Sequence, residues 1–243
     1  MNDPRSRLIV ALDVPDRAAA IQTVDRLSGH VGYFKIGLEL FTREGPTLVH
    51  EIRDRARNRG EKIFLDLKLH DIPNTVRGAV RSAGRLGIGM LTLHASGGSK
   101  MLSAASDEAE KFDAPPLLLA VTALTSLSEV EMQTLGVSGS MEHWVERLAE
   151  LAAGSGIAGV VASSKELPML KQKFQDSLKF VIPGIRPFGT AHQDQSRTAT
   201  PGDAIRSGAD FLVVGRPILQ ASDPAKAADD IVAEIASALN AKT

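Results

Sequence analysis

The sequence predicts a single (β/α)8 barrel, an α/β fold in which eight parallel strands form a closed ring surrounded by helices. Short apolar runs of strand length alternate along the chain with stretches of helical periodicity, as in βα units around a parallel sheet. Eight such runs occur in 243 residues, close to the roughly 250 that one barrel uses. Because no linker or low-complexity segment divides the chain, we expect one domain over residues 1–243.

The first half of the chain supplies four of the expected strands. Each is a run rich in Val, Ile, Leu or Phe, and apolar residues at helical spacing follow it. The expected strands are residues 8–13, 31–36, 62–68 and 90–94, and the helical patterns after them are residues 17–28, 39–59, 76–86 and 99–111.

The second half continues the pattern with less regular connections. The expected strands are residues 117–121, 159–162, 179–182 and 211–214, with helical patterns at 141–153 and 224–239. A longer polar connection, residues 122–140, precedes the helical pattern at 141–153.

Composition excludes several classes of function. The chain has 28 basic and 29 acidic residues and a net charge of −1, so no overall field attracts nucleic acid or anionic membranes. The absence of cysteine excludes disulfides, thiolate chemistry and cysteine-ligated zinc. Neither a signal-peptide core nor an apolar run of membrane-spanning length is present. We therefore expect a cytoplasmic protein with no nucleic-acid partner and no membrane association.

The third expected strand carries full charges. A period of two residues places Asp66 and Lys68 on one face of this strand, with Leu65 and Leu67 on the other. Asp71 follows just past the strand end, close enough to complete an Asp–Lys–Asp group. Charges are unfavourable in a sheet covered on both faces unless they are paired. The stretch is therefore either a half-exposed strand with a solvated ion pair or a charged site at the mouth of a barrel.

Polar residues recur where the expected strands end. In (β/α)8 barrels the chemistry lies at the carboxyl ends of the strands, so this repetition favours a functional site there. These residues are Asp13, Lys35, Asp66, Lys68, Asp71, His94, Thr122, Thr125, Ser163, Arg186 and Arg216. We expect His94 to be structural, and no histidine of the chain shows the spacing of metal ligands.

The last two strand ends predict a phosphate site. Gly215 ends the eighth strand, and Arg216 and then Pro217 follow at the expected start of a helix. Backbone N–H groups and an arginine suit a phosphate, and phosphate-binding barrels place it on these loops. Arg186 begins a polar loop, residues 187–200, that we expect to act as a flap. The alternative is a purely structural Gly-Arg-Pro turn.

Seven motifs at successive strand ends identify a family. They are Leu-Asp at 12–13, Phe-Lys-Ile-Gly at 34–37, Asp-Leu-Lys-Leu-His-Asp-Ile-Pro-Asn-Thr at 66–75, Thr-Leu-His-Ala at 92–95, Val-Thr-Ala-Leu-Thr-Ser at 121–126, Pro-Gly-Ile-Arg at 183–186 and Val-Gly-Arg-Pro-Ile at 214–218. With them, the chain resembles the orotidine 5′-phosphate decarboxylase family over essentially its whole length.

The resemblance implies decarboxylation of orotidine 5′-monophosphate to UMP, the last step of de novo pyrimidine biosynthesis, with no metal and no organic cofactor. It also implies a homodimer in which the second subunit contributes one acid to a charged network at the reacting carbon. The residues implied to form this network are Lys35, Asp66, Lys68 and, from the second subunit, Asp71. Lys68 would stabilise negative charge at C6 of the pyrimidine and then protonate it.

The resemblance also implies the residues that bind the substrate. Ribose contacts are expected from Asp13, Lys35 and, across the interface, Thr75. Thr125 would contact the pyrimidine, and Gln195 would bridge base and phosphate from the flap. The phosphate would be held by Arg186, Gly215 and Arg216.

Two other functions remain open. One is a magnesium-dependent sugar-phosphate decarboxylase or aldolase of the same suprafamily, which shares Asp-x-Lys-x-x-Asp but uses an acid where this chain has Lys35. The other is a nucleotide-binding barrel without catalytic activity.

Overall fold

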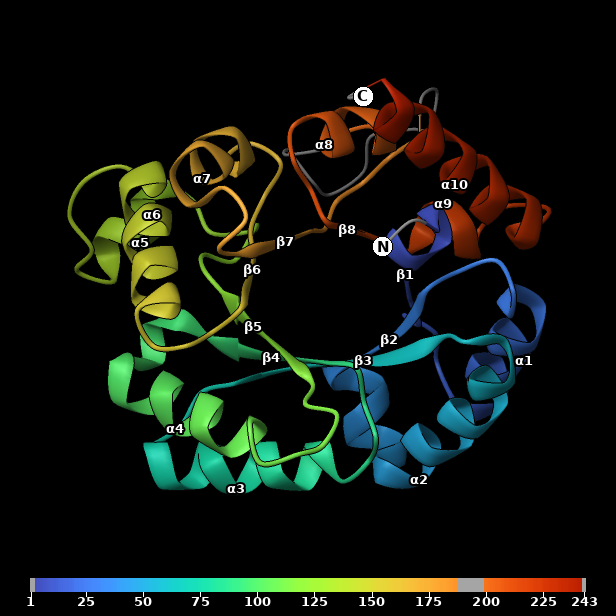
Figure 1. The fold of residues 1–243 in the computed structure, drawn as a ribbon, viewed down its shortest axis with the longest axis horizontal. Helices are drawn as coiled ribbons and strands as arrows, with labels where there is room; N and C mark the ends of the chain where they lie inside the picture. The colour runs from blue at the N-terminus through green and yellow to red at the C-terminus, as the bar shows by residue number, and fades with distance from the viewer. Residues whose placement is uncertain (1–2, 188–198, 242–243) are drawn as a thin grey trace.

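In the computed structural model, which describes residues 3–187 and 199–241, eight parallel strands close into a barrel in sequence order (Figure 1). Strand β8 pairs with β1, so the sheet has no free edge. The strands are β1 (Leu8–Ala11), β2 (Tyr33–Gly37), β3 (Lys62–Leu69), β4 (Met90–His94), β5 (Leu117–Val121), β6 (Gly159–Val161), β7 (Lys179–Ile182) and β8 (Phe211–Val214). The predicted fold class is therefore confirmed.

The helices lie outside the ring of strands (Figure 1). They are α1 (Arg17–Leu27), α2 (Leu38–Ala56), α3 (Pro73–Gly84), α4 (Ser99–Ala109), α5 (Glu129–Thr134), α6 (Met141–Ala153), α7 (Leu167–Phe174), α8 (Pro201–Arg206), α9 (Arg216–Leu219) and α10 (Pro224–Asn240). The described residues also form three short 3₁₀ helices: η1 (Pro4–Arg7), η2 (Arg57–Arg59) and η3 (Ala95–Gly97). Over the part of the chain described, no helix has the length and apolar character needed to cross a membrane.

Two stretches have local structure that the sequence pattern did not specify. The connection 122–140 contains a helix, α5, because Ser128 and Glu131 form a capping box in which each side chain binds the other's backbone N–H. The stretch 39–59 is not one regular helix, because Gly45, at φ 67°, and Pro46 introduce a kink into α2. The sequence also did not predict α7 and α8, whereas the helix start expected at Arg216 and Pro217 is present as α9.

Alternation along the strands divides the apolar side chains into two groups. Those pointing away from the barrel axis, such as Val10 and Leu65, pack against the helices in the larger core. Those pointing inward fill the barrel interior; they are Ile9, Ala11, Phe64, Met90, Leu119, Val181, Phe211 and Val213. Toward the carboxyl ends of the strands, the inward-pointing residues change from apolar to polar. Register therefore places a polar mouth above a packed apolar floor.

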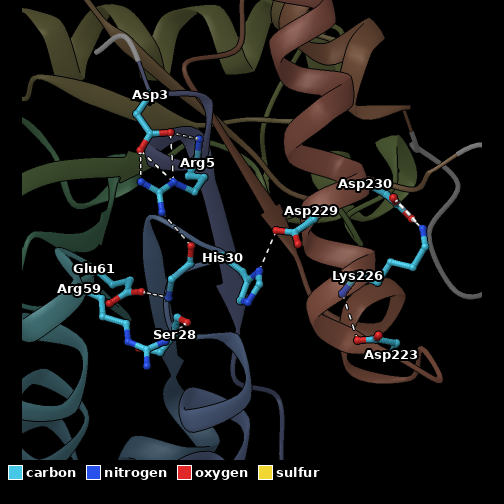
Figure 2. A network of polar contacts seen from close by, with 11 residues as sticks. Asp3, Arg5, Ser28, His30, Arg59, Glu61, Asp223, Lys226, Asp229 and Asp230 are labelled. Atoms are coloured by element: carbon cyan, nitrogen blue, oxygen red, sulfur yellow. Dashed lines mark hydrogen bonds and ion pairs between the residues drawn. The ribbon is translucent and has the colours of Figure 1, made fainter.

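The opposite end of the barrel is held by polar contacts around the loop that joins α1 to β2. Both backbone groups of Gly29 are bound in this loop: its carbonyl accepts a hydrogen bond from Arg5 at 2.8 Å, and its N–H donates to Glu61 (Figure 2). His30, the next residue, contacts Asp229 of α10 at 2.7 Å. Segments from both ends of the chain therefore converge on one loop, away from the mouth.

Candidate active site

A cavity of about 260 Å³ opens at the carboxyl ends of the strands. Its lining contains eight of the residues that the sequence singled out, contributed by β2, β3 and the segments after β1, β5, β7 and β8. They are Asp13, Lys35, Asp66, Lys68, Thr125, Arg186, Gly215 and Arg216. The residues expected at the reacting carbon and those expected at the phosphate therefore share one cavity.

The carboxylate of Asp66 lies at the centre of the charged network. Both of its oxygens accept hydrogen bonds from Lys68 Nζ at 2.9 Å, and Oδ1 also accepts one from the Thr92 hydroxyl at 2.8 Å. Lys35 Nζ lies 3.5 Å from Oδ2. Burial raises the pKa of Asp66, but the charges of Lys35 and Lys68 and the hydrogen bonds from Lys68 and Thr92 outweigh it, so the pKa lies below its ordinary value. The carboxylate is therefore ionised at neutral pH.

Lys35 extends this network toward the solvent. Its ammonium lies 3.5 Å from Oδ1 of Asp13 as well as 3.5 Å from Asp66. The side chain of Lys35 is only 11% exposed, whereas that of Asp13 is 61% exposed. Positive and negative groups thus alternate from the rim of the cavity to Lys68.

A second group of side chains forms an apolar wall. The sequence alone does not indicate that these residues belong to the site. They come from four different strands and the connection after β5, and their apolar side chains are typical of core residues. They are Phe64, Val121, Leu124, Val161 and Val213. A flat, partly apolar ligand group suits this wall, with the charged network on one side of it.

Two arginines also line the cavity. Arg186 follows β7 and Arg216 follows β8, and both are half-buried. Burial lowers the pKa of Arg186, and the nearby charge of Arg216 lowers it further. Arginine nevertheless stays charged in proteins, so a bound anion relieves the repulsion between the two cations.

Gly215 allows close approach beside this arginine pair. A Cβ atom at position 215 would lie 3.3 Å from Oδ2 of Asp13 and 3.6 Å from the Cβ of Ala11. Any side chain there would press on the carboxylate and fill part of the cavity. Glycine at position 215 therefore keeps the space beside Asp13 and Ala11 open.

Two histidines lie beside the network. The rings of His70 and His94 are tilted against each other with centroids 5.4 Å apart. Burial lowers the pKa of His94, and the charges of His70 and Lys68 lower it further, so His94 is neutral at pH 7. Neither ring lines the cavity, and His70 is exposed whereas His94 is half-buried.

Three predicted residues lie elsewhere. Within one chain Asp71 does not complete the group around Lys68: it is exposed, and its carboxylate accepts the N–H of Ile72 at 2.6 Å. Thr75 is exposed on α3 and does not line the cavity of its own chain. Gln195, with most of the expected flap, lies outside the described residues.

Thr92 is the polar residue at the network that the sequence analysis missed as a site residue. It is fully buried on β4 and contacts both Asp66 and Lys68. The signal was present in the alternation of β4, where Met90 faces the barrel interior and the residue two positions on must do the same. A lone threonine in an apolar strand did not look functional.

The pKa of Asp66 predicts a pH-dependent effect on stability. Because the folded-state pKa lies below the ordinary value, the ionised carboxylate stabilises the fold above about pH 4, and this contribution is lost as pH falls through the folded pKa. We expect Asp66→Asn to lower the free energy of unfolding at pH 7 by roughly 1–3 kcal/mol, because charged groups lose their partner. Urea unfolding at pH 7, 5 and 3.5 should show the deficit unchanged at pH 5 and smaller at pH 3.5.

The control is Asp54→Asn, which removes a carboxylate that is 62% exposed and pairs with Arg53. It should change stability little at any of these pH values. A deficit in Asp66→Asn that is absent at pH 7, or that grows as pH falls, would contradict a depressed pKa.

Comparison with known proteins agrees with this geometry. A model of the orotidine 5′-phosphate decarboxylase / HUMPS family matches residues 6–231. Proteins named orotidine 5′-phosphate decarboxylase from Syntrophotalea carbinolica and Saccharophagus degradans are 48% and 44% identical, and each alignment covers 98% of this chain and 98% of the relative. The crystal structure of orotidine 5′-phosphate decarboxylase from Lactobacillus acidophilus superposes with a TM-score of 0.83 at 38% identity, covering 94% of this chain and 98% of that one. The chain therefore belongs to the orotidine 5′-phosphate decarboxylase / HUMPS family.

Proposed function

We propose that this protein decarboxylates orotidine 5′-monophosphate to UMP, with Lys68 as the group that meets and protonates the carbon losing carbon dioxide. One observation carries the proposal: the Asp66–Lys68 pair and the two arginines line the same cavity. Relatives 44–48% identical over nearly the whole chain bear the name of this activity. The whole barrel, residues 1–243, is proposed to act as one catalytic domain in the cytoplasm.

The reaction explains why the site is built from charges. When the bond between C6 and the carboxylate breaks, its electron pair stays on C6 in an orbital in the ring plane, where the ring π system does not delocalise it. Fixed positive charge close to C6 is then the main source of stabilisation. Lys68 Nζ, held by both oxygens of Asp66, supplies this charge and then transfers a proton to C6.

Asp66 has a second effect on the bound substrate. The substrate carboxylate would lie near the carboxylate of Asp66, and two such charges about 4 Å apart repel by roughly 4 kcal/mol at an effective dielectric constant near 20. Departure of neutral carbon dioxide removes this repulsion. We assign more of the rate to stabilisation of the carbanion, because repulsion in the ground state contributes only if binding elsewhere offsets it.

That binding is proposed to come from the phosphate. Arg186, Gly215 and Arg216 would hold the phosphate group. Gly215, which lies next to Asp13, would leave room for it. Gln195, outside the described residues, would close over it from the flap. Thr125 would contact the pyrimidine, and Asp13 with Lys35 the ribose. Remote binding energy used in this way appears in kcat as well as in KM.

The remaining network residues are proposed to come from a second subunit of a homodimer. Asp71 and Thr75 are exposed in their own chain, and between them Ile72 exposes 67% of its apolar side chain. An exposed apolar residue flanked by an acid and a hydroxyl suits an interface that inserts the acid into a neighbouring site. Asp71 of one subunit would then reach Lys68 of the other.

The direct test is to mix purified protein with orotidine monophosphate in excess EDTA and follow the ultraviolet absorbance. We expect conversion to UMP at the same rate with and without EDTA. Activity that EDTA abolishes would support a magnesium-dependent relative instead, in spite of the cation at Lys35. Binding of UMP without any conversion would identify a nucleotide-binding barrel.

The variant Lys68→Ala tests the proton donor. Turnover should fall by at least about 10³-fold, within the range of general acid catalysis combined with lost electrostatic stabilisation. Binding of UMP, measured by calorimetry, should persist because the arginine pair is intact. The control Lys226→Ala removes a lysine that is 69% exposed on α10 and should leave turnover unchanged. Normal turnover in Lys68→Ala would remove this residue from the mechanism.

Mixing two inactive variants tests the shared site. Lys68→Ala and Asp71→Ala homodimers should each be inactive, but a reassorted heterodimer contains one site with both residues intact. We expect mixing under conditions of subunit exchange to restore up to about a quarter of wild-type activity, since half the dimers are mixed and each has one competent site. No recovery after exchange has been demonstrated by mass spectrometry would place Asp71 in its own subunit's site.

A further inference from the structure

The position of Lys68 depends on an irregularity in β3. Pairing between β3 and β4 is regular up to Leu65 and resumes at Leu69. Because β4 advances by only two residues over the same interval, three residues of β3 lie opposite the single residue Thr92. Such a bulge redirects side chains and often lies next to a site.

Lys68 lies within this bulge in an unusual backbone conformation. Its φ of 50° is in the left-handed region, which among the described non-glycine residues only Gln175 shares. A long side chain is unfavourable there and stays only where surrounding contacts hold it. Contacts that hold the Lys68 backbone in this conformation therefore also help to fix the position of its side-chain ammonium.

The Thr92 hydroxyl supplies two of the contacts that the bulge needs. It accepts a hydrogen bond from the backbone N–H of Lys68 at 2.9 Å and donates one to Oδ1 of Asp66 at 2.8 Å. A hydroxyl is the smallest side-chain group that can accept and donate at once. Thr92 is also completely buried, so no solvent replaces either bond if the hydroxyl is removed.

We propose that Thr92 is a positioning residue for the decarboxylation, whose hydroxyl holds the Lys68 backbone in its left-handed conformation and orients the carboxylate that binds the Lys68 ammonium. Thr92 does not line the cavity and is not proposed to touch the substrate. Its effect on turnover rests on the proposed function, because it acts through Lys68.

The test compares Thr92→Val, which keeps the shape but loses the hydroxyl, with Thr92→Ser, which keeps the hydroxyl. We expect kcat of Thr92→Val to fall roughly 10- to 100-fold, the loss typical of a hydrogen bond to a charged group, with KM and UMP affinity within about 3-fold of wild type. Thr92→Ser should recover kcat to within about 5-fold. The control is Ser106→Ala, which removes a buried hydroxyl that donates to the backbone carbonyl of Gly156, between α6 and β6. This variant should leave kcat unchanged.

A pH titration separates positioning from a general loss of stability. Burial raises the pKa of Asp66 and the Thr92 hydrogen bond is among the influences that lower it, so Thr92→Val should raise this pKa and move the acid limb of kcat/KM to higher pH. Carboxyl-carbon NMR of the free protein should show the same rise for Asp66, together with faster exchange of the Lys68 amide proton.

The outcomes distinguish the two proposals. If the wild type does not decarboxylate orotidine monophosphate, the proposed function fails, while the NMR measurements still decide whether Thr92 positions Asp66 and Lys68. Wild-type kcat in Thr92→Val, equal losses in the Val and Ser variants, or an unchanged Asp66 pKa with unchanged Lys68 amide exchange would each overturn the role of Thr92.

Discussion

The buried carboxylate of Asp66 is the interaction on which the rest of the site depends. A carboxylate that is only 13% exposed is unfavourable unless charged partners and hydrogen bonds compensate for lost water. Here the partners come from three strands: Lys35 from β2, Lys68 from β3 and Thr92 from β4. Each partner is in turn held by Asp66, so the geometry of the network and the ionisation of its centre are mutually dependent. The same carboxylate that fixes the lysine also presents negative charge to the cavity, so in the proposed mechanism Asp66 both positions Lys68 and repels the substrate carboxylate.

The barrel makes this arrangement possible because its packed interior and its reactive groups lie at different levels along the barrel axis. The inward-facing side chains form a dry apolar floor, with Tyr33 and Phe211 packed edge to face at a centroid distance of 5.8 Å. One inward step further, the strands carry charged or polar groups at the mouth. Strands that are hydrogen-bonded into a closed sheet hold these groups in fixed positions, as preorganised electrostatics require. The polar contacts around Gly29 close the opposite end, where they do not interfere with the mouth.

The two charged groups that line the cavity have different electrostatic characters. Around Asp66 the charges alternate in sign and nearly balance, so this part of the site suits a group whose charge changes during the reaction. At Arg186 and Arg216 two cations lie near each other, which suits a permanent anion. Orotidine 5′-phosphate, with a carboxylate on its base and a phosphate on its ribose, has one group of each kind, and relatives in the family carry the name of its decarboxylase. The division of labour follows from charge distribution alone and agrees with the family assignment.

The sequence by itself determined the fold class, the strand order and the charged residues that line the cavity, because alternation and strand-end polarity are local properties of the chain. It even contained the Ser128–Glu131 capping box, although the polar composition of residues 122–140 masked it. Only the tertiary structure decided three matters: that β3 bulges and Lys68 adopts a left-handed conformation, that Thr92 of the neighbouring strand accepts a hydrogen bond from the Lys68 backbone, and that Asp71 does not line the cavity of its own chain. Each depends on register between strands or on the path of a turn in space. Those are set by the packing of distant segments against one another, and a one-dimensional pattern does not specify them.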